Sequence, residues 1–185
     1  MASMQLFDRN RHLNRWIQGA KEGDPRAQKS IYDMLSAKMY AVCLRYMGDR
    51  ESACDVLQDG FVTLFSKLDT YSGEGSFEGW ARRIFINTAL MSLRRHDVMT
   101  GTEDIETAYS LADEGMDALQ SMNYRELLDM VATLPAGFRT VFNMYVIEGY
   151  SHKEIGQKLG IEEATSRSQL QRARMLLQEK IKGRK

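Results

Sequence analysis

The feature that most constrains the fold is the segment 151–174, where two helical patterns are separated by one glycine. Ser151 and Glu154 have the S-x-x-E spacing of a capping box, in which each side chain satisfies an unpaired backbone donor at a helix start. Gly160 follows the first pattern and tolerates the left-handed conformation that commonly ends a helix. A short helix, a tight turn and a second helix are therefore predicted, which is the outline of a helix-turn-helix.

The second helix of this pair has an inward face and a basic face. The residues of the inward face recur at steps of three or four: Ser166, Leu170, Ala173, Leu177 and Ile181. The other side carries guanidinium forks and short hydrogen-bonding groups: Arg167, Ser168, Gln171, Arg172 and Arg174. Such groups suit the bases and phosphates of a DNA major groove, so we expect this face to bind DNA. The alternative is an ordinary amphipathic helix with a solvated charged face.

Long helical patterns and only two prolines in 185 residues predict an all-α chain. Helices are expected from about 13 to 23, 25–48, 49–68, 77–95, 124–133 and 136–147, before the pair described above. The net charge of zero is unevenly distributed, with balances of +3, −7 and +4 over residues 1–96, 97–123 and 124–185. We therefore expect two small helical domains joined by a flexible acidic linker, the second a winged-helix-like four-helix domain with the helix-turn-helix.

Several function classes are disfavoured by composition. No apolar run approaches the ~20 residues that span a bilayer, and the polar N-terminus has no signal-peptide core, so a cytoplasmic protein is expected. The histidines are scattered, and there is no phosphate-binding glycine motif or metal-ligand cluster. We expect no enzyme activity, cofactor, metal or small-molecule substrate, and we interpret His152 as an exposed residue at a helix start.

Two faces in the N-terminal half carry further signals. On the third helix, Asp55, Gln58, Asp59 and Val62 lie opposite the core stripe, so they form an exposed face that could be merely solvated. On the fourth helix, one stripe combines an aromatic ring, an amide and guanidinium groups: Trp80, Arg83, Asn87, Leu90 and Arg94. Opened DNA requires such a mixture, because cations hold phosphates, apolar groups replace lost stacking, and an amide can bond an exposed base edge.

Three segments carry a family resemblance: RYMGDRESACDVLQDGFVTLF, GSFEGWARRIFINTALMSLRR and LPAGFRTVFNMYVIEGYSHKEIGQKLG. Over about 31–95 and 134–181 the chain resembles the extracytoplasmic-function class of RNA polymerase sigma factors, of the sigma-70 family. The resemblance implies a transcription initiation factor that binds core RNA polymerase, at its beta-prime clamp helices and beta flap, and directs it to promoter DNA. It also implies an anti-sigma factor partner, linked to the membrane.

The same resemblance implies three sets of site residues. The polymerase-binding set is Asp55, Leu57, Gln58, Asp59, Phe61 and Val62. The set for the melted minus-ten element is Ser72, Ser76, Phe77, Trp80, Arg83, Asn87, Arg94 and Arg95, where Phe77 could instead be a core aromatic. The set for the minus-thirty-five element is Arg167, Ser168, Gln171, Arg172 and Arg174.

Two other function classes compete with this interpretation. One is a stand-alone dimeric helix-turn-helix regulator, and the other is an adaptor that binds polymerase or partner proteins without DNA. For the acidic linker, the resemblance implies a path along basic surfaces through the polymerase. The residues alone leave two other roles open: a simple tether, or a segment that folds back on the two basic domains of the free protein.

Overall fold

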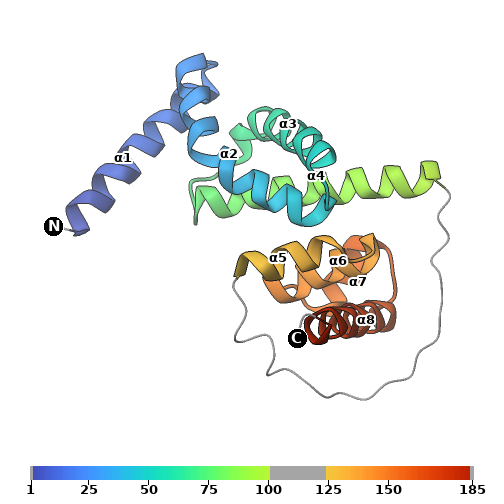
Figure 1. Ribbon diagram of the computed structural model, residues 1–185. Helices are drawn as coiled ribbons and strands as arrows, with labels where there is room; N and C mark the ends of the chain where they lie inside the picture. The colour runs from blue at the N-terminus through green and yellow to red at the C-terminus, as the bar shows by residue number, and fades with distance from the viewer. Residues whose placement is uncertain (1, 101–123, 184–185) are drawn as a thin grey trace. The chain divides into compact units, whose positions relative to one another are not determined.

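The computed structural model describes residues 2–100 and 124–183, with side chains described for 12–95 and 126–183. All regular secondary structure in these ranges is helical, with no strand in them, so the all-α prediction is confirmed (Figure 1). Its elements are α1 (Ala2–Lys21), α2 (Pro25–Met47), α3 (Arg50–Ser66), η1 (Leu68–Thr70), α4 (Phe77–Thr100), α5 (Tyr124–Ala132), α6 (Ala136–Phe142), η3 (Asn143–Ile147), α7 (His152–Leu159) and α8 (Glu163–Lys182). The acidic linker was predicted over residues 97–123, but residues 97–100 form the end of α4, and residues 101–123 lie outside the described part of the chain.

The helices form two compact units. One unit comprises Met1–Cys43 and Glu51–Ala89, and the other Leu44–Arg50 and Leu90–Lys185. None of the described helices is both long enough and apolar enough to cross a membrane.

In the core of the first unit, the buried rings of Phe61 and Phe85 meet, and the more exposed ring of Tyr32 packs against Phe61 at the edge. The Phe61 ring of α3 lies 4.5 Å from the Tyr32 ring of α2 and 5.0 Å, edge to face, from the Phe85 ring of α4. Gly60 makes this approach possible, because a Cβ atom there would lie 2.4 Å from two atoms of the Phe85 ring. Phe85 is 0% exposed, so its ring has little freedom to move away.

Replacing Gly60 with alanine is therefore expected to destabilise the first unit by about 1–2 kcal/mol. The overpacking against Phe85 outweighs the gain in helix propensity, which is at most about 1 kcal/mol. The matched control is Gly79→Ala in α4, where a Cβ atom would lie 3.6 Å from Ser76 Cβ, an ordinary contact. Thermal unfolding should show a lower melting temperature for Gly60→Ala alone; equal melting temperatures for the two variants would contradict this packing.

Three details differ from the sequence-based expectation. Helix α1 begins at Ala2 rather than near residue 13, because no glycine or proline occurs before Gly19 to end it. Helix α4 continues to Thr100 rather than ending at 95, since the next glycine is at 101. The helical period predicts a core stripe of Ala53, Leu57, Phe61, Leu64 and Leu68 on the third helix. Four of these residues are buried, whereas Leu57 is only half-buried and Val56 is buried instead.

The second unit is built around α8, which packs against α6 and α7. The predicted capping box is confirmed: the Glu154 backbone N–H donates to Ser151 Oγ, and the Ser151 backbone N–H donates to a Glu154 carboxylate oxygen at 2.8 Å. Gly160 ends α7 in the left-handed conformation, with φ of 73°. The backbone N–H of Ile161 then donates to the carbonyl of Gly156, which closes the tight turn before α8.

The buried Arg139 side chain holds the connection between α5 and α6. Its guanidinium group donates to the backbone carbonyls of Ala132 at 3.1 Å and Leu134 at 3.0 Å. Ala132 is the last residue of α5 and Leu134 follows the helix, so neither carbonyl can accept an intrahelical hydrogen bond, and the arginine satisfies groups that would otherwise be costly to bury. Arg139 thereby holds the segment between α5 and α6 in place.

Candidate polymerase and nucleic-acid interfaces

The outer face of α3 is polar with one large apolar residue. Asp55, Gln58 and Asp59 are exposed, and Val62 is 66% exposed. Phe61 belongs to the predicted polymerase-binding set, but it is buried. It therefore supports the exposed residues of this face and is not itself available for contact. An exposed valine among carboxylates, at helical spacing, is suited to contact with a protein surface that is partly basic.

The loop before α4, residues 71–76, is held by its own hydrogen bonds. The Tyr71 hydroxyl donates to the Gly75 carbonyl at 3.1 Å, and Ser72 Oγ accepts from the Glu74 backbone N–H at 3.3 Å. Ser76 Oγ accepts from the Gly79 backbone N–H at 3.3 Å, at the start of α4. The two predicted serines, Ser72 and Ser76, thus lie on an exposed loop of defined shape.

A group of three aromatic rings lies at the junction of this loop with α4. The Phe77 ring is 5.1 Å from Tyr71 and 5.6 Å from Trp80, and Tyr71 and Trp80 are 5.3 Å apart. Phe77 is only 3% exposed, so it is a core aromatic, whereas Trp80 is half-buried. Sequence reasoning did not select Tyr71, although its position beside the glycine-containing loop was a usable signal.

The outer face of α4 presents the remaining residues of the minus-ten set. Arg83, Asn87, Arg94 and Arg95 are exposed, while Leu90 is buried. Met91, four residues after Asn87, is 55% exposed and extends this face as an apolar residue that sequence reasoning missed. The helix therefore presents an amide between cations, with an apolar residue next to it.

The basic face of α8 is displayed as predicted. Arg167, Ser168, Gln171 and Arg174 are exposed and Arg172 is half-buried, while the inward stripe is buried except for the half-buried Ile181. Arg167 forms a salt bridge with Glu163 one turn earlier, at an exposed position. Exposed pairs of this kind contribute little stability, so Arg167 can exchange this carboxylate for another acceptor at low cost.

His152 differs from its sequence-based interpretation as an exposed residue at a helix start. It is half-buried, and its ring stacks on that of Tyr145, with centroids 4.4 Å apart and planes inclined by 19°. Its Nδ1 atom lies 2.9 Å from Ser166 Oγ, within hydrogen-bonding distance. The histidine thus connects α7 to the buried side of α8, across 14 positions of sequence.

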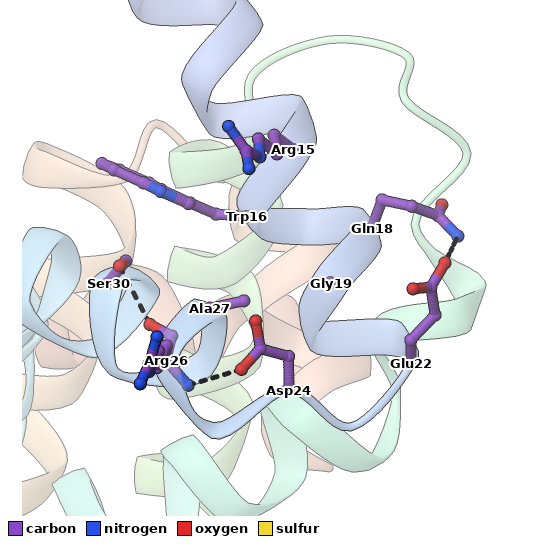
Figure 2. Close-up of a pocket in the computed structure, with 9 residues that line it drawn as sticks. All are labelled: Arg15, Trp16, Gln18, Gly19, Glu22, Asp24, Arg26, Ala27 and Ser30. Atoms are coloured by element: carbon purple, nitrogen blue, oxygen red, sulfur yellow. Dashed lines mark hydrogen bonds between the residues drawn. The ribbon is translucent and has the colours of Figure 1, made fainter.

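A separate depression lies between α1 and α2 (Figure 2). It is lined by Arg15, Trp16, Gln18, Gly19, Glu22, Asp24, Arg26, Ala27 and Ser30. Three hydrogen bonds already join residues of the wall: Gln18 Nε2 donates to Glu22 at 2.8 Å, the Arg26 backbone N–H donates to Asp24 at 2.9 Å, and Ser30 Oγ donates to the Arg26 carbonyl at 3.0 Å. This open depression includes no residue of the three predicted sets, and its mixed charges do not indicate one ligand.

Two family models match the chain. The model described as Sigma-70 region 2 matches residues 31–98, and the model described as Sigma-70, region 4 matches residues 124–177, so together they cover well over half of the chain. The first match contains α3, the 71–76 loop and most of α4, and the second contains α7 and most of α8, the two helices of the helix-turn-helix. The chain belongs to the sigma-70 family. It is a sigma factor of the extracytoplasmic-function class, which directs RNA polymerase to promoters, and the stand-alone regulator is not favoured.

Individual relatives agree with this family assignment. The chain is 25% identical to the ECF RNA polymerase sigma factor SigW of Bacillus subtilis, over 92% of this chain and 97% of that protein. It is 25% identical to the ECF RNA polymerase sigma-E factor of Haemophilus influenzae, over 89% and 93%. The solved sigma factor RpoE of Bartonella quintana shares the fold, with a TM-score of 0.51 and 20% identity over 83% of this chain and 96% of that one. Sigma factors are non-enzymatic regulators.

Proposed function

We propose that this sigma factor uses three surfaces, one that binds core polymerase and two that bind promoter DNA. Residues 1–96 bind core polymerase through the outer face of α3 and bind the melted minus-ten element through the 71–76 loop and α4. Residues 124–185 bind the minus-thirty-five element through α8, and the acidic residues 97–123 connect the two. The observation that supports this proposal best is the exposed Arg83 and Asn87 face of α4, which follows directly on the structured loop.

The chemistry of the minus-ten surface is that of promoter melting. Separating base pairs loses stacking, and Trp80 and Met91 offer apolar surface that can replace part of it. Asn87 can donate to and accept from the edge of an unpaired base, and Arg83, Arg94 and Arg95 can neutralise phosphates. Phe77 would act through the loop that it supports, not by contact with DNA.

Polymerase carries out the chemistry of RNA synthesis in this proposal, so the protein itself needs no catalytic residue or cofactor. It would act in the cytoplasm, where polymerase and promoter DNA are found. The solved Bartonella quintana relative is in complex with the anti-sigma factor NepR. We propose that an anti-sigma factor likewise regulates this protein by covering one or more of the three surfaces.

The polymerase-binding proposal is tested by reversing a charge on α3. Asp59→Lys should weaken binding to core polymerase by about five- to tenfold, because it places a cation on an otherwise acidic and apolar face. The matched control is Asp69→Lys, which makes the same change at an exposed position of η1 in the same unit. Affinity is measured by fluorescence anisotropy of the labelled protein, and equal effects of the two substitutions would mean that α3 does not provide the docking face.

A further inference from the structure

A side-chain hydrogen bond joins the two helices of the helix-turn-helix. His152 is the first residue of α7, and its Nδ1 atom pairs with Ser166 Oγ of α8 at 2.9 Å. Ser166 is 0% exposed, so water cannot replace this partner. A buried hydroxyl that loses its partner retains the full cost of desolvation, which makes the bond sensitive to any separation or rotation of the two helices.

The histidine ring is itself held in place. Tyr145 of η3 stacks on one of its faces at a centroid distance of 4.4 Å, which restricts rotation of the imidazole about its side-chain torsions. Burial lowers the pKa of His152, and the nearby cations Arg167 and Arg174 lower it further, against the opposing effect of Glu163. The imidazole is therefore neutral at pH 7, with one nitrogen that donates and one that accepts.

Ser166 directly precedes two residues of the DNA-reading set, Arg167 and Ser168. Successive residues of a rigid helix cannot rotate independently, so a constraint on Ser166 is a constraint on the direction of both neighbours. Leu170 and Ala173 hold α8 by apolar contact, which is less directional than a hydrogen bond. The hydrogen bond thus supplies a directional constraint next to the first residue of the basic face.

We propose that His152 is a positioning residue for promoter recognition. Backed by Tyr145, it sets the rotation of α8 through Ser166 and thereby directs Arg167 and Ser168 at the minus-thirty-five element. The inference rests on the proposed role of α8, and it assigns to His152 an indirect role, without contact to DNA.

The test uses the full chain with core polymerase on a promoter that depends on a minus-thirty-five element. His152→Phe keeps a ring against Tyr145 but removes the partner of Ser166, and should lower promoter affinity about tenfold. Ser166→Ala, which removes only a hydroxyl, should cause a similar loss, and the double variant should lose no more than either single one. His152→Asn returns a polar group near the position of Nδ1 and should retain affinity within about threefold.

The same series on a promoter with a scrambled minus-thirty-five element separates positioning from general stability. Under the proposal, the variants differ little in their affinity for the scrambled promoter. Their melting temperatures should show that each protein is folded at the assay temperature. Losses that add in the double variant, or a His152→Asn variant as weak as His152→Phe, would overturn the positioning role. Arg167→Ala serves as the reference. If neither Arg167→Ala nor the His152 and Ser166 variants change affinity for the intact promoter, the proposed role of α8 fails. If Arg167→Ala lowers this affinity and the other variants do not, only the inference about His152 is overturned.

Discussion

Replacing Asn87 with alanine is expected to slow promoter opening by about 10- to 100-fold while leaving affinity for core polymerase unchanged. Asn87 is exposed on the outer face of α4, between the cations Arg83 and Arg94, and no core contact depends on its amide. In the proposed role, the Asn87 amide contacts a base only after that base has left the duplex, so the substitution should raise the free energy of the opened state alone. Opening is measured by the rate at which unpaired thymines of the minus-ten element become reactive to permanganate.

The control for this prediction is Asn14→Ala, which removes an exposed asparagine from α1, outside the predicted sites. It should leave both opening and core binding unchanged. If Asn87→Ala reduced core binding and opening equally, the outer face of α4 would be a polymerase contact, and the assignment of this helix to the minus-ten element would be wrong.

Arg167→Ala is expected to lower affinity for a promoter with an intact minus-thirty-five element by about 10- to 100-fold, the value of one good base contact. The salt bridge to Glu163 is exposed and contributes little, so the stability of the second unit should hardly change. The measurement compares holoenzyme affinity for the intact promoter and for one with a scrambled minus-thirty-five element, at one salt concentration.

Arg167→Lys distinguishes base reading from phosphate binding at the same position. Lysine keeps the charge but loses the planar fork that contacts a base edge through two hydrogen bonds. If Arg167 reads a base, the lysine variant should lose most of the discrimination between the two promoters. Retained discrimination would place Arg167 against the phosphate backbone and leave sequence reading to other residues of α8.

The helix-turn-helix was the part of the fold that the sequence predicted best, because its signals are local. The Ser151 and Glu154 capping box and the turn at Gly160 each depend on residues within four positions of one another. The inward stripe of α8 follows from the helical period alone, and burial of Ser166, Leu170, Ala173 and Leu177 confirms it. The exposed faces of α3 and α8 followed from the same period, as the opposite sides of buried stripes. On α4 the expected stripe was only partly exposed, because Leu90 is buried and Trp80 half-buried.

The features that sequence reasoning missed depend on contacts between distant positions. From the sequence alone, Gly60 is only a residue of low helix propensity. The structure shows that it makes room for the Phe85 ring, 25 positions later. In the same way, Ser166 is an unexplained polar residue on an apolar stripe until His152 is found beside it. Val56 replaced Leu57 in the core of α3 because neighbouring apolar residues fit the period equally well, and only the packing partner decides between them.

Run-off transcription tests the central claim most directly. Core RNA polymerase is incubated with and without this protein on a library of genomic promoter fragments from its source organism, and the transcripts are sequenced. If the protein is a promoter-directing sigma factor, specific transcripts appear only when it is present, and their start sites share two elements at the spacing of minus ten and minus thirty-five. The same transcripts with and without the protein, despite an active polymerase, would contradict this account.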